Sequence, residues 1–119
     1  MNPETLKKRT KDFAMRIIKL VDALPKNSIG RTIGNQLLRA GTSVGANYRA
    51  ACRAKSNKDF IYKINIVEEE ADETMFWLEL IIETELLSEK RIKSLLKEAD
   101  ELTAIFTATG KTAKTKKKF

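Results

Sequence analysis

The chain has no histidine and only one cysteine, Cys52. The commonest general base is therefore absent, and so is the Glu-x-x-His pair that the di-metal centres of helical bundles require. A lone thiol can form neither an internal disulfide nor a zinc site built on several thiolates, and it favours a reducing compartment. We expect no enzymatic activity and no metal or other cofactor.

Long apolar runs are also missing. No stretch reaches the roughly 18 consecutive apolar residues of a membrane-spanning helix, so we expect no membrane association. The first residues do not combine the basic and apolar segments of a signal peptide, which predicts a cytoplasmic protein. Prolines are few, and Pro3 and Pro25 stand where helices would start and stop.

Apolar residues recur at three- and four-residue spacing through most of the remaining sequence, which is typical of helices. The pattern predicts helices over residues 3–24, 29–54, 57–87 and 89–110. Because the links between them are short, consecutive helices should run antiparallel. We predict an all-α fold, an up-down-up-down antiparallel four-helix bundle that forms one domain over residues 1–110.

The end of the chain has a different composition. Gly110 is suited to end the last helix, and Asn57 to cap the third. Residues 111–119 read KTAKTKKKF, with five lysines and no acid. We predict that they form a disordered basic tail.

Four of the five glycines lie in the second predicted helix, and we predict that they mark helix packing. They are Gly30, Gly34, Gly41 and Gly45, spaced by four, seven and four residues. On a helix they share an arc of roughly 60°, and each costs about 1 kcal/mol relative to alanine, so a close approach of another helix should compensate. The alternative, a phosphate-binding loop, lacks the G-x-G-x-x-G spacing and a following Gly-Lys-Ser/Thr.

The same helix carries Arg39, Ser43 and Asn47 at four-residue spacing, which places them on one face. We predict a structural polar network in which these residues meet Glu73 of the third helix. Glu73 belongs to the acidic run VEEEADE, residues 67–73. A magnesium site in this run has no supporting motif, and pairing with arginines or solvation is the preferred interpretation.

Charge is segregated along the chain. The charged residues within 26–63 are all basic except for Asp59. Residues 68–89 contain acids and no lysine or arginine. The basic segment and the tail form a candidate surface for nucleic acid that would contact phosphates and carry little sequence preference. The candidate residues are Arg31, Arg49, Arg53, Lys55, Lys58, Lys63, Lys111, Lys114, Lys116, Lys117 and Lys118.

Three segments together resemble the 23S ribosomal RNA intervening-sequence family of small bacterial proteins. They read LPKNSIG, QLLRAGTSVGANYRAACRAKS and DFIYKINIVEEEADETMFWLEL. Arg39, Ser43 and Asn47 match the family's R-x-x-x-S-x-x-x-N signature, and Asp59–Phe60 and Glu73 match its third-helix pattern. The sequence departs from the family at Ala50–Ala51, where Glu-Gly is frequent, and at Glu70, where serine is common.

The resemblance implies a four-helix bundle that assembles as a ring-shaped homopentamer. It also implies kinship with nucleic-acid-binding accessory proteins of diversity-generating retroelements. Apolar residues on most faces of residues 75–87 independently favour self-association.

Two hypotheses for function follow. The first is a non-catalytic homo-oligomer, most simply the pentamer, that binds RNA or DNA. The second is a structural or protein-interaction scaffold, in which the acidic third helix and the apolar faces recruit another protein.

Overall fold

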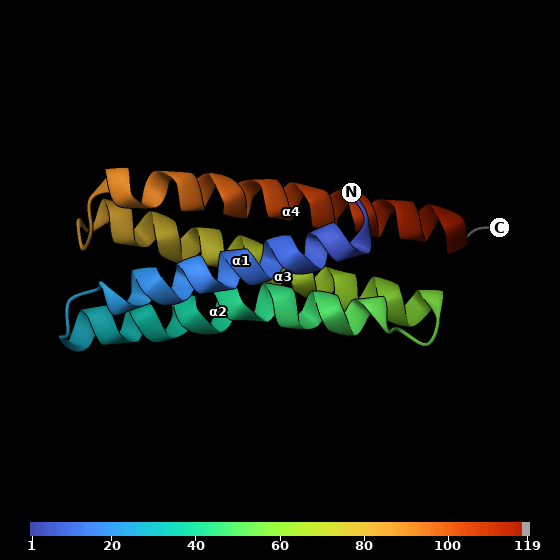
Figure 1. The fold of residues 1–119 in the computed structure, drawn as a ribbon, viewed down its shortest axis with the longest axis horizontal. Helices are drawn as coiled ribbons and strands as arrows, with labels where there is room; N and C mark the ends of the chain where they lie inside the picture. Colours follow the sequence, from blue (N-terminus) through green and yellow to red (C-terminus); the bar gives the residue numbers. More distant parts are fainter. Residues whose placement is uncertain (118–119) are drawn as a thin grey trace.

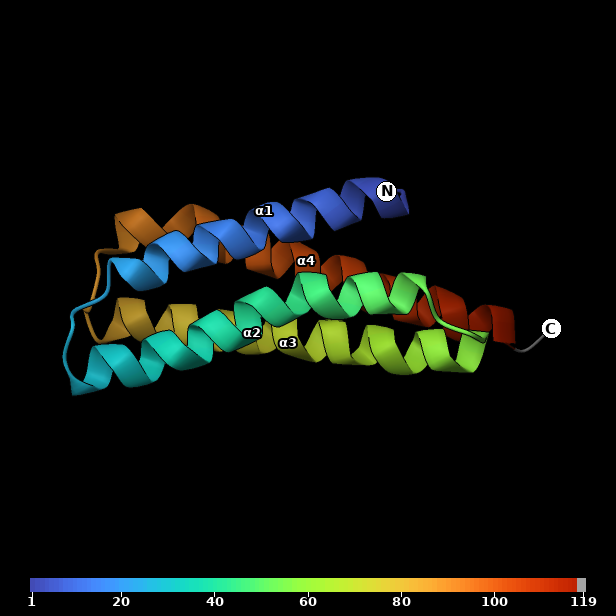
Figure 2. The same ribbon diagram turned by 60° about the horizontal axis from the view of Figure 1, so that its bottom comes forward.

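The computed structural model describes residues 1–117 and contains four long helices (Figure 1). They are α1 (Pro3–Asp22), α2 (Ser28–Cys52), α3 (Asn57–Glu83) and α4 (Glu89–Lys117). Consecutive helices run antiparallel and form a rod of 52 × 20 × 20 Å, as Figure 2 shows from a second direction. The predicted antiparallel four-helix bundle is confirmed.

Capping side chains set where the first three helices begin. The Asn2 side chain accepts a hydrogen bond from the Thr5 amide at 2.8 Å, and Asn27 accepts one from Gly30 at 2.9 Å. Helix α3 is capped by Ser56, which accepts from the Asp59 amide at 3.0 Å. The prediction of Asn57 as this cap was therefore wrong by one residue. A preceding serine satisfies the exposed amides equally well.

The third helix ends earlier than its apolar pattern predicts. Leu86 donates its amide to the Ile81 carbonyl at 3.1 Å, and Glu85 donates to Ile82 at 3.0 Å, which is the bonding of a Schellman motif. Glu85 takes the left-handed position of this motif, with a φ of 58°. The apolar residues after Glu83 therefore fold back against the helix instead of extending it.

The fourth helix ends later than predicted, so the prediction that Gly110 stops it was wrong. The helix passes through Gly110 without a positive φ and continues to Lys117. Gly110 is buried, and a Cβ atom there would lie 3.6 Å from Ile64 Cγ2, so the glycine lies in a packed contact with α3. Ala113 is also buried, which holds residues 111–117 in the bundle instead of a disordered tail. Lys118 and Phe119 lie outside the described residues.

The core runs the length of the rod and takes large side chains from all four helices. Fully buried examples are Phe13, Ile17, Leu37, Ile64, Leu78, Ile81, Ile92, Leu102 and Phe106. Tyr48 of α2 packs against Phe106 of α4 with ring centroids 5.3 Å apart. In the described part of the chain, no helix combines the length and apolar character needed to cross a membrane.

On its α2 side, helix α1 packs against the glycines. A Cβ atom on Gly41 would lie 2.7 Å from Ile17 Cγ1, closer than real contacts allow. At Gly45 the nearest atoms belong to Thr10, whose carbonyl carbon would lie 3.4 Å away. The remaining two differ: Gly34 faces the ends of Leu24 and Val21, and Gly30 leaves room for the carbonyl of Pro25 in the α1–α2 turn. Residues of α1 or of its C-terminal end therefore pack against three of the glycines, and the α1–α2 turn packs against the fourth.

On its α4 side, helix α1 is held by polar side chains and approaches its neighbour less closely. Arg9 donates two hydrogen bonds of 2.7 Å to Glu98 and one of 2.8 Å to Glu101. The bond to Glu98 is the largest factor that raises the pKa of Arg9. Arg16 adds a 2.8 Å bond to Ser94. One hollow lined by residues of both helices lies between these contacts, and a second lies beyond Arg16.

Candidate nucleic-acid interface

One end of the rod is strongly basic. The last turns of α2, the α2–α3 turn, the start of α3 and the last turns of α4 meet there (Figure 1). Together they present exposed lysines and arginines, which we call the basic end: Arg49, Arg53, Lys55, Lys58, Lys111, Lys114 and Lys116. Two sets that are far apart in the sequence, the basic segment and the supposed tail, therefore lie on one surface.

The continuation of α4 brings these two sets together. Asn57, the first residue of α3, donates a 3.0 Å hydrogen bond from Nδ2 to the Ala113 carbonyl. Ala113 is buried beside it, so the last two turns of α4 lie against the start of α3. Gly110 also faces α3, and glycine suits this close approach as well as it suits a helix end.

None of the seven cations of the basic end forms a salt bridge with any of the described residues. Acids are scarce around them. Asp59 is bound by Lys63 at 2.8 Å, and this bond is the main reason that the pKa of Asp59 is lowered. Glu4 is bound by Lys7 at 3.2 Å. The field at this end is therefore set by positive charges without internal partners.

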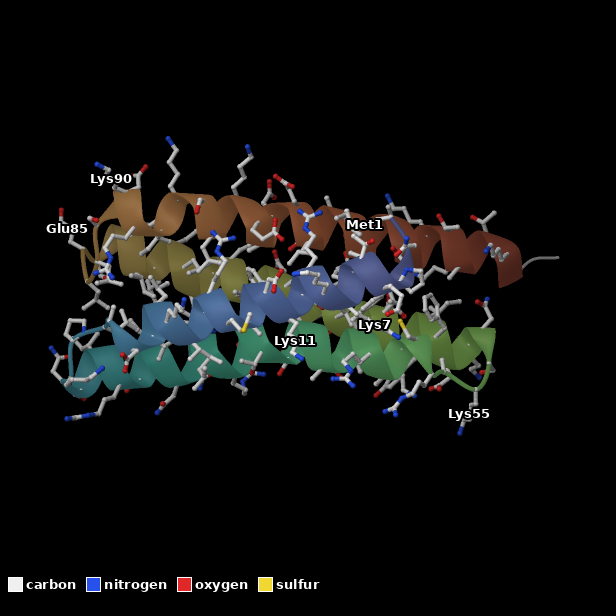
Figure 3. The ribbon with its side chains drawn as sticks, viewed as in Figure 1. Met1, Lys7, Lys11, Lys55, Glu85 and Lys90 are labelled. Carbon is white, nitrogen blue, oxygen red and sulfur yellow. The ribbon has the colours of Figure 1, made fainter. Side chains whose placement is uncertain are left out.

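The opposite end of the rod has mixed charge. Figure 3 shows Glu85 and Lys90 there, and Lys55 at the basic end. Arg31 also lies toward this opposite end, where it lines a hollow with Pro25 and Lys26. It is separated from Arg49 by 18 positions of α2, or about 27 Å of helix.

The structure therefore does not bring together all the predicted contact residues. Arg31 is remote from the others, and Lys63 is half-buried and forms a salt bridge with Asp59. Lys117 is the last helical residue, but its side chain, like the whole of Lys118, lies outside what the structure describes. The remaining predicted residues make up the basic end.

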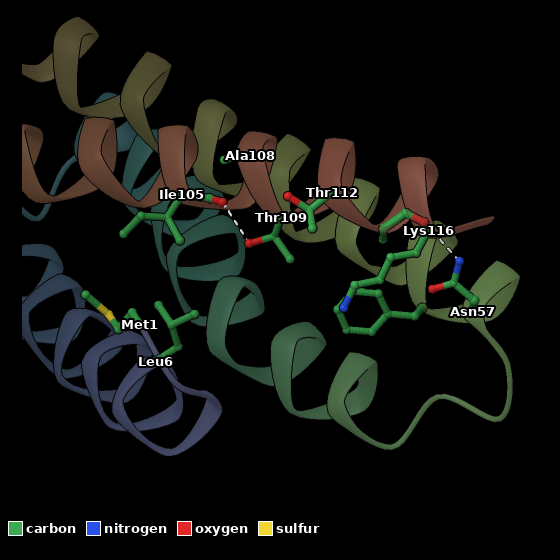
Figure 4. A pocket seen from close by; sticks show the side chains of 10 residues that line it. Met1, Leu6, Asn57, Ile105, Ala108, Thr109, Thr112 and Lys116 are labelled. Atoms are coloured by element: carbon green, nitrogen blue, oxygen red, sulfur yellow. Dashed lines mark hydrogen bonds between the residues drawn. The ribbon is translucent and has the colours of Figure 1, made fainter. Parts of the chain in front are cut away.

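A groove opens in the basic end because α1 begins short of the other helices (Figure 1). It consists of two adjoining hollows that share Met1, Leu6, Phe60 and Thr109, and the larger has a volume of about 730 Å³. Figure 4 shows Asn57, Ile105, Thr112 and Lys116 around it. No aspartate or glutamate lines either hollow. Periodicity along single helices gave no signal for this groove, because the groove depends on where separate helices end.

The predicted polar network around Arg39 lies elsewhere, on the exposed side between α2 and α3. Arg39 donates to Glu70 at 2.9 Å and also binds Glu73, which in turn accepts a 3.0 Å bond from Trp77 Nε1. The bond from Trp77, followed by the pairing with Arg39, lowers the pKa of Glu73. The structure brings Arg39 and Glu73 together and adds Glu70 and Trp77.

Ser43 and Asn47 bond to their own helix. The Ser43 hydroxyl donates to the Arg39 carbonyl at 2.6 Å, and Asn47 Nδ2 donates to the Ser43 carbonyl at 2.9 Å. Within residues 1–117, no three histidine, cysteine or carboxylate side chains are grouped to hold an ion.

These features define a small all-α bundle protein with one basic end. The chain belongs to the family of 23S rRNA-intervening sequence proteins, whose model matches residues 5–108. A crystal structure of a protein of unknown function from the S23 ribosomal protein family of Bacteroides thetaiotaomicron VPI-5482 has the same fold. It is 37% identical, with a TM-score of 0.86, over 93% of this chain and 99% of that one. A comparison with curated proteins found no match. The family resemblance of the sequence is confirmed.

Proposed function

We propose that the protein is a non-catalytic homo-oligomer that binds RNA or DNA through phosphate contacts at its basic end. The observation that carries the proposal is the gathering of seven exposed cations, without salt bridges among the described residues, where α2, α3 and α4 meet. Such cations gain free energy by releasing counterions from a nucleic acid. The lone Cys52 is consistent with action in the cytoplasm.

Exposed apolar side chains support self-association. Met15 and Ile18 on α1 are about half exposed, as is Phe76 on α3, and Tyr62 is more so. In a closed ring of parallel copies the basic ends would gather on one face, and weak contacts would then add by multivalency. The pentamer is the ring we propose, on the basis of the family resemblance. Light scattering that shows only a 13.5 kDa species at micromolar concentration would contradict it.

Salt dependence tests the binding itself. Affinity for a labelled RNA and a labelled DNA of unrelated sequence should fall steeply and similarly with salt. Arg49→Glu combined with Arg53→Glu should reduce the slope of log affinity against log salt by about 0.9 per lost contact on duplex DNA, or about 0.7 on single strands. If the parent binds neither nucleic acid at low salt, the proposal fails.

A second candidate is a protein-interaction scaffold without nucleic-acid binding. The observation that favours it is that exposed Phe76 and Tyr62 lie on α3, the helix that also carries the acidic run. Aromatic residues are enriched in protein interfaces. Under this alternative, Phe76→Ser would abolish capture of a protein partner, while reversal of charges at the basic end would leave that capture unchanged.

A further inference from the structure

Phosphate contacts at the basic end do not account for the groove that opens there. Its lining is largely apolar, with Leu6, Phe60 and Ile105 from three different helices. Phe60 is only half-buried and lines both hollows, so its side chain borders the open space. Leu6 is buried, so the apolar surface that the groove exposes comes from partly buried side chains such as Phe60 and Ile105, and it stays in contact with water unless a ligand covers it.

The charges around the groove restrict the ligand. Lys7 borders the groove on the α1 side and Lys116 borders it on the α4 side. No carboxylate lines the groove, and nearby Glu4 is paired with Lys7 at 3.2 Å, so Lys116 and the other cations of the basic end set the charge that an anion meets there. Polar groups are also present, because the Asn57 carboxamide and the Thr112 hydroxyl belong to its wall (Figure 4). The ligand should therefore combine a flat apolar part, hydrogen-bonding edges and negative charge.

We propose that the groove takes an unpaired base of a single-stranded nucleic acid, whose phosphates lie on the surrounding lysines. This inference rests on the proposed function and adds to it that the ligand is single-stranded. A positively charged surface with an aromatic side chain in it is how proteins bind single strands without sequence preference. A base in a duplex is stacked and paired, so it cannot enter the groove.

The dimensions favour a base over a helix of a protein partner. The lining positions of α4 run from Ile105 to Lys116, which is about 16 Å of helix. A partner helix of that length would bury far less than the roughly 800 Å² per partner of a stable interface. A single base needs little apolar surface, because its phosphates supply most of the affinity.

An oligonucleotide without bases separates the two contributions. We compare the binding of three 12-nucleotide probes at one salt concentration: single-stranded oligothymidylate, the same strand with abasic sites throughout, and a duplex. The parent should bind oligothymidylate about tenfold more tightly than the abasic strand, because one stacked base is worth about that factor. The affinity for the duplex should show no such gain over the abasic strand, because the bases of a duplex are paired and stacked.

Phe60→Leu keeps the apolar volume but removes the aromatic face, so it should bring the two single strands to within about twofold of each other. Phe76→Leu is the matched control, since Phe76 lies on the same helix outside the groove, and should preserve the difference. Ala108→Leu provides a second test if Phe60→Leu does not fold. Ala108 is exposed on the groove wall, and a larger side chain there should lower the oligothymidylate affinity alone.

The possible results are distinguishable. If the parent binds both single strands equally, or if Phe60→Leu and Ala108→Leu leave their ratio unchanged, the inference is overturned while the proposed function stands. A groove that holds an acidic helix of a protein would leave that ratio unchanged in both variants. If the parent binds none of the probes at low salt, the proposed function itself fails.

Discussion

Helix α1 contacts its two neighbours in different ways. Toward α2, glycines let side chains such as Ile17 lie directly against the partner helix, so the contact is set by shape. Toward α4, the contact depends on Arg9 and its two carboxylates, with hollows beside it. One side should therefore be sensitive to added volume, and the other to lost charge.

Gly41→Leu should have the largest effect on stability. Even a Cβ atom would lie 2.7 Å from Ile17 Cγ1, so a leucine must displace α1. We expect a loss of about 3 kcal/mol or more in the free energy of unfolding. Chemical denaturation measures it. An unchanged midpoint would show that the glycine side of α1 is not a tight contact.

Arg9→Met should come second. The side chains of Arg9 and Glu98 are 22% and 18% exposed, so the variant leaves a largely buried carboxylate without its partner. We expect a loss of about 1–2 kcal/mol, between the values for exposed and fully buried pairs. Lys8→Met is the control, because Lys8 and Asp12 form an exposed pair that should contribute less than about 0.5 kcal/mol. Equal effects of the two variants would contradict the role given to Arg9.

Glu73→Gln tests a third kind of contact, between α2 and α3. Its partner Arg39 is 49% exposed, so we expect a loss of at most about 1 kcal/mol at neutral pH. Since the pKa of Glu73 is lowered in the folded protein, its contribution is complete above the ordinary carboxyl pKa and is lost as the pH falls through the folded value. Thermal melts of both proteins should therefore converge progressively as the pH falls below the ordinary carboxyl pKa of about 4.3. A difference that persists in acid would point to packing instead of charge.

Gly34→Ala should have the smallest effect. Its new Cβ would lie 3.3 Å from the ends of Leu24 and Val21, which can shift, and alanine favours the helix by about 1 kcal/mol. We expect a net change of less than about 0.5 kcal/mol, or a small gain. A loss as large as that of Gly41→Leu would mean that the α2 side is uniformly tight.

The comparison also shows which features the sequence could predict. The glycine spacing indicated a packed helix face, and the structure places that face against α1. The same residue type misled at Gly110, because glycine suits both a helix end and a close contact, and only the position of α3 decides between them. The early end of α3 was hidden for a related reason, since Glu85 takes a position that glycine usually occupies.

Contacts between distant charges were harder to predict. Arg9 binds carboxylates 89 and 92 positions away, and helical periodicity gives no signal for contacts at that separation. Arg31 and Arg49 share a face of one helix, but charge patterns along the sequence do not show that they belong to opposite ends of the rod. The basic end and its groove likewise depend on where four separate helices begin and end.

Matched charge reversals at the two ends test the central claim most directly. One variant carries Arg53→Glu, Lys55→Glu and Lys58→Glu at the basic end, and the other carries Lys26→Glu, Arg31→Glu and Lys90→Glu at the opposite end. Net charge changes equally, so general electrostatic attraction falls equally in both. Binding of a labelled single-stranded RNA should be weakened by more than about hundredfold in the first variant and by less than about tenfold in the second. Equal losses in the two variants, or no loss in the first, would contradict a binding site at the basic end.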